Sequence, residues 1–196
     1  MRKRTLLRHA LAAIFLLGFV VSAPALAGKD KTFLDSDAAK EADEPQKFLP
    51  DYGKLVEGKD ADWVFFPNGS LKEKKKVVLN AFQSNAVETH AVDARHAAEY
   101  APEFLKKWLT KQGFEVVDSG GDMVIDGNVF NAWEPSGGAR FWGGWMANPG
   151  CGIEVVLKDG KGDILGFVRH KSRGSTIKDA VENGLEEVAK AIAKGK

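Results

Sequence analysis

The chain has 196 residues, with 28 Lys and Arg, 27 Asp and Glu, and one cysteine, Cys151. This length is typical of a single domain with a sizeable core, and a lone cysteine excludes an intramolecular disulfide. The near balance of charge lacks the basic excess typical of nucleic-acid-binding proteins, so we expect no nucleic-acid partner.

The first 27 residues have the three parts of a secretory signal peptide. Four basic residues precede an apolar run at Leu11–Val21, and small residues at Ala25–Ala27 predict cleavage after Ala27. The apolar run is shorter than the roughly 18 residues of a membrane anchor. The remaining chain carries a formal charge of −3, because the signal contains four of the basic residues and none of the acidic ones. We therefore expect a periplasmic protein without a transmembrane segment in the mature chain.

The residues after the signal divide into a tether and one domain. Residues 28–47 are rich in Lys, Asp, Glu and Ala and contain few large apolar side chains, which predicts a flexible charged tether. Residues 48–196 form the expected single α/β domain, opened by the compact block Phe48–Leu55. Trp63–Phe66 and Lys76–Phe82 are short apolar runs that predict strands. The basic run Lys72–Lys76 reads as a solvated approach to the second strand.

A helix is expected after this second strand and the polar stretch that follows it. Four apolar residues repeat at helical spacing: Phe104, Leu105, Trp108 and Leu109. Pro102 suits a first turn and Gly113 a C-terminal stop. Whether Asp93–Tyr100 joins the helix stays open, because an internal proline removes a backbone hydrogen bond.

Four further strand segments follow this helix. Phe114–Val117 gives a β-α-β unit with the preceding strand, which allows parallel pairing. Met123–Trp133 alternates and predicts a half-buried strand, with Trp133 on the same face as Met123. Ile153–Lys158 and Ile164–His170 flank an Asp-Gly-Lys-Gly turn and predict an antiparallel hairpin.

The last segment is the clearest helix in the sequence. Thr176 is placed to cap it, with Asp179 three positions later, and the following apolar residues repeat at helical intervals. Together these elements predict a two-layer α/β fold, with a mixed sheet of about five strands and two main helices packed on it.

Short blocks of the chain resemble known bacterial envelope lipoproteins. Phe48-Leu49, Asp51-Tyr52 and Lys75–Leu79 resemble the opening of domain of unknown function family 3313. Ala-Pro-Glu-Phe-Leu, Gly113-Phe114 and the segment from Gly138 to Gly152 are similar to the related family 4410. The resemblance implies a fold like the N-terminal domain of TolB, without an assigned enzyme activity or catalytic residues. Members usually carry a lipid-modified cysteine after the signal, where this chain has Gly28.

A segment rich in glycine and tryptophan, 131–152, contains the candidate binding residues. These are Trp133, Arg140, Phe141, Trp142 and Trp145. A phosphate-binding loop is disfavoured, because such loops lead into a helix and this segment leads into a strand. The aromatic side chains, with Asn128, Asn131 and Arg140, suit a surface on which sugar rings stack. The alternative is that they are core packing, and the sequence favours it.

The sequence gives weaker support to a metal site and to a catalytic nucleophile than to a binding surface. His90, Asp93 and His96 have three-residue spacings that place them near one another on a helix, but no complete zinc ligand set is evident. Cys151 with His170, or Ser175 with His170, lacks a local signature and a third orienting residue. We expect Cys151 to be buried as a small apolar residue.

The sequence therefore predicts a non-enzymatic periplasmic accessory protein that binds or helps assemble a component of the cell envelope. The expected partner is an envelope protein or a glycan, with no cofactor, and a homo-oligomer is compatible with the chain. The alternatives are a peptidoglycan-binding or other glycan-binding module and, less favoured, a hydrolase that depends on cysteine or a metal.

Overall fold

The computed structural model describes residues 47–86, 91–134 and 148–195. These residues form a short 3-10 helix, eight strands and two α-helices. In chain order they are η1 (Tyr52–Lys54), β1 (Val56–Glu57), β2 (Trp63–Phe65), β3 (Lys76–Leu79), β4 (Gln83–Ser84), α2 (Ala91–Lys111), β5 (Glu115–Val116), β6 (Met123–Trp133), β7 (Gly150–Lys158), β8 (Ile164–Arg173) and α4 (Ile177–Lys194).

The strands form one mixed sheet with the order β1-β2-β8-β7-β6-β3-β5, and β4 pairs with β6 at the side of this path. The long strands β6, β7 and β8 are antiparallel neighbours, while β3 runs parallel to both β5 and β6. The predicted α/β class, the hairpin of β7 and β8 and the parallel β-α-β pairing are confirmed. The sheet has eight strands rather than about five, and six of the eight match segments that the sequence predicted as strands. The two unexpected strands, β1 and β4, have two residues each, too short to show a periodic pattern.

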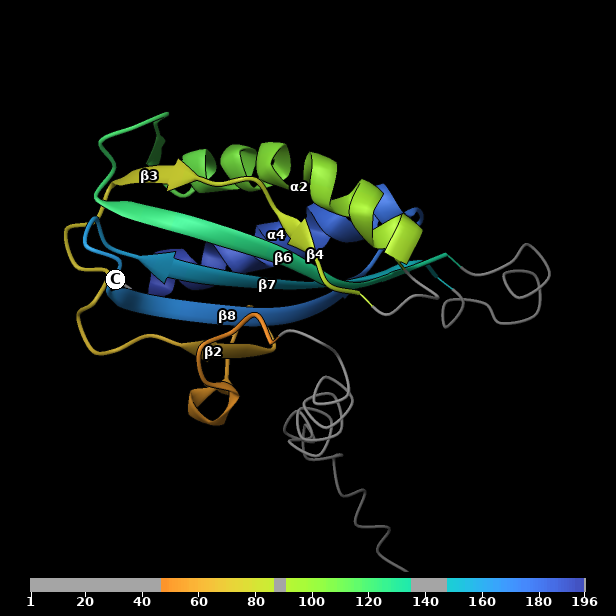
Figure 1. Ribbon diagram of the computed structural model, residues 1–196, viewed down its shortest axis with the longest axis horizontal. Coiled ribbons are helices and arrows are strands. Elements are labelled where there is room, and N and C mark those ends of the chain that lie inside the picture. Colours follow the sequence, from red (N-terminus) through yellow and green to blue (C-terminus); the bar gives the residue numbers. More distant parts are fainter. Residues whose placement is uncertain (1–46, 87–90, 135–147, 196) are drawn as a thin grey trace, which may run out of the picture.

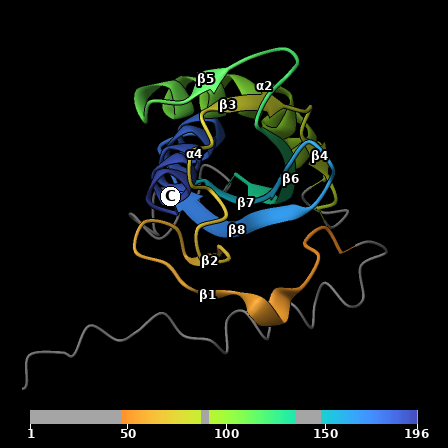
Figure 2. The same ribbon diagram turned by 90° about the vertical axis from the view of Figure 1, so that its left-hand side faces the viewer.

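Both helices lie on the same side of the sheet, as Figure 1 and Figure 2 show. The main core lies between them and the strands, and it includes the helix-facing residues of β7 and the apolar stripe of α4. Thr176 caps α4 as predicted, because its hydroxyl accepts a hydrogen bond from the backbone N–H of Asp179 at 3.0 Å.

The first long helix, α2, begins a full three turns earlier than Pro102. Pro102 lies inside the helix rather than in its first turn, so that expectation is wrong. A stripe of buried side chains runs through the proline without a break: Ala94, Ala97, Ala98, Ala101, Leu105 and Leu109. Packing of this stripe offsets the roughly 3 kcal/mol that an internal proline costs. Gly113, at φ 85°, follows the helix end as expected.

A second, smaller core lies on the opposite face of the sheet. The chain from Phe48 to β1 crosses under β2 and β8, which Figure 2 shows below the sheet. We call residues 48–55 the strap. It brings Leu49 and Leu55 against three sheet residues: Trp63, Val156 and Phe167. The strap therefore covers one part of the helix-free face and leaves the other part without a covering element among the described residues.

Candidate functional site

The helix-free face of β6, β7 and β8 holds two glycines where neighbouring strands carry large side chains. Gly150 lies opposite Trp133 of β6 and Arg173 of β8, and Gly152 lies opposite Asn131 and Lys171. Because glycine has no Cβ, the middle strand is open at these two positions. A Cβ built on Gly150 would lie 2.5 Å from Nε1 of Trp133, so the indole ring occupies the space that a side chain would need.

The position of Trp133 depends on a β-bulge in β6. The register shifts between Val129 and Asn131, so that Phe130 and Asn131 both stand against Gly152. An extra residue in a strand reverses the facing of every residue beyond it. Ala132 consequently enters the core, and Trp133 moves to the helix-free face. The expectation that Trp133 shares the face of Met123 is wrong for this reason.

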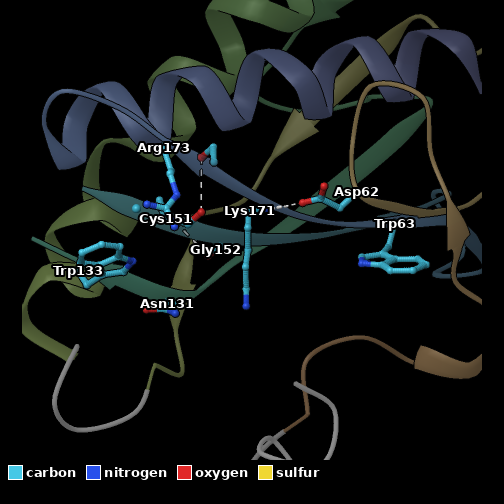
Figure 3. Close-up of a pocket in the computed structure, with 10 residues that line it drawn as sticks. Asp62, Trp63, Asn131, Trp133, Cys151, Gly152, Lys171 and Arg173 are labelled. Carbon is cyan, nitrogen blue, oxygen red and sulfur yellow. Dashed lines mark hydrogen bonds between the residues drawn. The ribbon is translucent and has the colours of Figure 1, made fainter. Parts of the chain in front are cut away.

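Gly150, Gly152 and the residues opposite them border a hollow of about 620 Å³ (Figure 3), which we call the trough. Its lining residues are Asp62, Trp63, Asn131, Trp133, Gly150, Cys151, Gly152, Lys171, Ser172 and Arg173. Figure 3 shows Lys171 between Trp133 and Trp63, with its ammonium group pointing away from the strands. The size falls within the range of sites for small ligands. Trp63 is 2% exposed and belongs to the smaller core, so it acts as a wall, whereas Trp133 is half-buried.

Cationic groups lie beside the aromatic rings of this face. The Arg173 guanidinium carbon is 5.7 Å from the centre of the Trp133 ring. Nζ of Lys171 is 5.6 Å from the Phe130 ring, which also receives the Arg169 guanidinium at 3.7 Å. Such contacts hold long basic side chains in defined positions. The trough thus combines a flat aromatic surface with positive charge.

A polar atom at the trough wall has no hydrogen-bond partner among the described residues. The side-chain oxygen of Asn131 is buried and makes no hydrogen bond to any described residue. A buried acceptor without a donor costs about 1–3 kcal/mol. A hydroxyl or N–H of a bound molecule that reached this oxygen would supply the missing donor.

Next to the trough, the strap is fixed by a buried ion pair. Glu154 of β7 and Arg169 of β8 are cross-strand neighbours, 0% and 2% exposed, and form a salt bridge. The hydroxyl of Tyr52 donates to Oε1 of Glu154 at 2.9 Å, and Nδ2 of Asn128 donates to Oε2 at 3.0 Å. This cluster is enclosed between strap and sheet. Asn128, expected with the sugar-binding residues, is fully buried here and does not line the trough.

The edge of β8 beside the trough is closed by side chains. β2 pairs with β8 only over Phe167–Arg169. Beyond it, the Asp62 carboxylate accepts the backbone N–H of Lys171 at 2.8 Å, and the Asn183 amide donates to the backbone oxygen of Arg173 at 3.0 Å. Addition of an extended peptide needs such groups to be available. Recognition on the β8 side of the trough therefore depends on side chains on the face of the sheet.

The candidate nucleophile Cys151 faces the helix side of β7. It is 3% exposed, and burial raises the pKa of its thiol to about 12. The thiol is therefore protonated at neutral pH, which is the unreactive form. Among the hydrogen bonds of the described residues, the thiol donates only to the adjacent carbonyl of Gly152, at 4.0 Å. The sequence expectation of a buried cysteine is met.

His170 is held between two carboxylates. Its Nδ1 lies 3.0 Å from Oδ2 of Asp62, and its Nε2 lies 2.5 Å from Oε2 of Glu187 on α4, although this second contact is not aligned as a hydrogen bond. Burial alone lowers the pKa of the imidazole, but the two carboxylates outweigh it and raise the pKa above 6.5. The imidazole of His170 thus links Asp62, in the β1–β2 connection, to Glu187 on α4. Ser175 bonds to Asp179 at the start of α4 rather than to His170.

The other candidate residues divide between the described and undescribed parts of the chain. Arg140, Phe141, Trp142, Trp145 and His90 lie outside the described residues, as do the predicted signal peptide and nearly all of the predicted tether. His96 is on α2, where its Nδ1 lies 3.5 Å from Glu99. No group of three or more His, Cys, Asp or Glu side chains within residues 47–86, 91–134 and 148–195 is arranged to hold a metal ion. No helix in that part of the chain is long and apolar enough to cross a membrane.

The sequence interpretation missed Asp62, Lys171 and Arg173. It ended the second hairpin strand at His170, but β8 continues to Arg173. Counting back from the turn would place Ser172 opposite Gly150 and His170 opposite Gly152. The register shifts by one residue between Leu157 and Lys158, however, so Arg173 lies opposite Gly150 and Lys171 opposite Gly152. A basic residue opposite a glycine in a long antiparallel pair predicts an open position on the face of a sheet.

Comparisons with known proteins find solved structures that resemble the chain at low similarity. No protein-family model matches the chain, and no curated protein matches it. A solved dodecamer of PelC from Paraburkholderia phytofirmans is 16% identical, with a TM-score of 0.40, over 58% of this chain and 88% of its own. A minor lipoprotein from Acinetobacter baumannii is 10% identical, with a TM-score of 0.30, over 62% and 94%.

A third structure is a protein of the domain of unknown function 330 family from Xanthomonas campestris, 10% identical, with a TM-score of 0.33, over 59% of this chain and 79% of its own. The proteins with which the chain shares this limited likeness thus include a bacterial lipoprotein and a protein from a family of unknown function. At these TM-scores the likeness carries no argument about function. The resemblance to families 3313 and 4410 stays a prediction, and the chain is described by its own geometry.

Proposed function

We propose that the chain is a non-catalytic accessory protein of the bacterial envelope, which binds an envelope component in the trough. The observation that carries the proposal is the trough itself: an open part of the helix-free face with a tryptophan, a lysine and an arginine on inner strands. Contiguous exposed aromatic and charged groups on a rigid sheet are typical of a binding surface. The sequence signal for export supplies the compartment.

The state of the potential catalytic groups supports binding rather than turnover. The thiol of Cys151 is buried and protonated, and His170 is engaged by Asp62 and Glu187 on the helix side of the strands. General acid–base or nucleophilic catalysis needs a reactive group within reach of a bound molecule. On the trough side, Lys171 and Arg173 provide charge and hydrogen-bond donors, which suits recognition.

The test is co-sedimentation of the purified protein with isolated envelope material, divided into cell-wall sacculi and outer-membrane fragments. We expect the wild type to sediment with one fraction and the double variant Trp133→Ala/Arg173→Gln to remain in the supernatant. The matched control is Lys111→Gln, which removes a lysine 3.8 Å from the Trp108 ring on α2. Equal sedimentation of the wild type and the trough variant would reject the trough as the binding site. Release of soluble fragments from the envelope material by the wild type would reject the non-catalytic role.

A further inference from the structure

The trough has the chemistry of a site for a carboxylated saccharide. We propose that it binds an acidic glycan, with a sugar ring against the face of Trp133 and a carboxylate held by Arg173 and Lys171. This inference rests on the proposed function and names the ligand of the same site.

The ring of Trp133 supplies a flat aromatic surface in the trough. Trp133 lies across Gly150, so its ring is supported by strand backbone rather than by another side chain. Phe130 lies in the same way across Gly152, where a Cβ would be 2.5 Å from its Cζ. Phe130 is 7% exposed and does not line the trough, so the ring face offered to a ligand is that of Trp133. Flat aromatic surfaces suit the C–H faces of sugar rings, which are apolar and equally flat.

Two basic side chains of β8 bring positive charge to the trough. Arg173 and Lys171 project from alternate positions of β8 on the same face, each opposite one of the glycines. A guanidinium binds a carboxylate through two parallel hydrogen bonds, and an ammonium adds a point charge. The acidic group that borders the trough, Asp62, is directed to the backbone N–H of Lys171 and to His170. Both basic residues take part in other interactions as well, so a ligand carboxylate would add to these contacts or exchange with them.

Strand pairing at the trough favours a glycan over an acidic peptide as the ligand. Extended peptides bind sheets chiefly by adding a strand at an edge. Here the middle strand of the trough, β7, is paired on both sides, and the nearby edge of β8 is occupied by the side chains of Asp62 and Asn183. The buried oxygen of Asn131 lacks a donor among the described residues, and sugar hydroxyls are donors that accompany a flat ring face.

Calorimetric titration tests the inference with three matched probes: an oligogalacturonate, the same oligosaccharide with its carboxyl groups methyl-esterified, and a polyglutamate peptide of similar charge. We expect binding of the oligogalacturonate, about tenfold or more weaker binding of the ester, since a charge-assisted hydrogen bond is lost, and weaker binding of the peptide. A muropeptide from peptidoglycan forms a separate arm. Tighter binding of the muropeptide or of the oligogalacturonate identifies the cell wall or an acidic polysaccharide as the source.

Variants assign the roles within the trough. Trp133→Ala should weaken the acid and the ester alike by about tenfold, and Trp133→Phe should retain most of the affinity. Arg173→Gln and Lys171→Gln should weaken only the acid, until the acid and the ester bind equally. Lys111→Gln should change neither. Thermal unfolding of each variant checks that the fold is intact, and this is expected because Trp133, Lys171 and Arg173 retain solvent exposure.

Equal binding of the acid and its ester by the wild type would overturn the inference, as would binding of polyglutamate as tight as that of the sugar. If neither saccharide binds while the trough variant still loses envelope sedimentation, the acidic-glycan inference fails and the proposed function stands. If the wild type does not sediment with envelope material at all, the proposed function fails first.

Discussion

The buried salt bridge under the strap gives the sharpest prediction about stability. Replacing Arg169 by Met removes this cation from beside the carboxylate of Glu154, which is 0% exposed, while the neutral donors of Tyr52 and Asn128 remain. Breaking a buried ion pair in this way costs about 3–5 kcal/mol. Because a domain is stabilised by only about 5–15 kcal/mol, the loss is a large part of the total.

The double variant Arg169→Met/Glu154→Met should be more stable than Arg169→Met alone. It removes both charges, and the remaining loss is that of an acceptor for Tyr52 and Asn128, about 1–3 kcal/mol. The assay is urea unfolding of both variants at pH 7, followed by tryptophan fluorescence, with the difference in free energy of unfolding as the result.

An exposed ion pair serves as the control for this prediction. Nζ of Lys190 lies 2.6 Å from Glu186 one turn earlier on α4, at 39% and 28% exposure. Lys190→Met should therefore produce little change, since exposed pairs contribute little to stability. The reasoning is refuted if Arg169→Met costs no more than Lys190→Met, or if the double variant loses the full sum of its two single changes.

Three other predictions follow from the same face and its surroundings. Gly152→Val should destabilise the fold by about 1–3 kcal/mol in urea unfolding, because its side chain would overlap the ring of Phe130, whereas Gly160→Ala meets nothing within 4 Å and should not. Cys151 should react with a thiol reagent at least about a hundredfold more slowly in the folded protein than in urea. The pKa of His170 is raised on folding, so its contribution to stability is complete below pH 6.5 and is lost as the pH rises through the folded-state pKa. The His170→Gln variant should lack this loss.

Each of these predictions has an opposing result. Equal unfolding midpoints for the Gly152 and Gly160 variants would show that the ring of Phe130 does not lie over β7. Rapid labelling of Cys151 under native conditions would mean that the thiol is exposed. For His170, the comparison is the difference in urea midpoint between wild type and His170→Gln from pH 6 to pH 9. A difference that stays constant across this range would contradict a raised pKa.

Much of the fold follows from local pattern. The apolar repeat and the cap at Thr176 predicted α4, and the Asp-Gly-Lys-Gly turn between two apolar runs predicted the hairpin of β7 and β8. Alternation in 123–133 predicted β6. These signals are strong because each is a property of one continuous segment, namely a period of 3.6 or of two residues with a defined terminus.

The errors arose where packing overrides a local preference. Pro102 favoured a helix start, but the buried alanines of α2 extend the helix across it. The two-residue strands β1 and β4 exist because longer neighbours pair with them. Neither result is visible in a short window of sequence, since the stabilising contacts come from residues distant in the chain.

The candidate site shows the same division. By itself the sequence determined that glycine and tryptophan are concentrated around 131–152, that β7 and β8 pair, and that the one cysteine lies just before an apolar strand segment. The tertiary structure decided which way these side chains face. A single bulge between Val129 and Asn131 turns Trp133 out of the core and sets it beside Arg173 across Gly150. Successive side chains of a strand point to opposite faces of the sheet, so one extra residue reverses the direction of every side chain beyond it. The position of that extra residue is fixed by pairing with the neighbouring strand rather than by the sequence of β6.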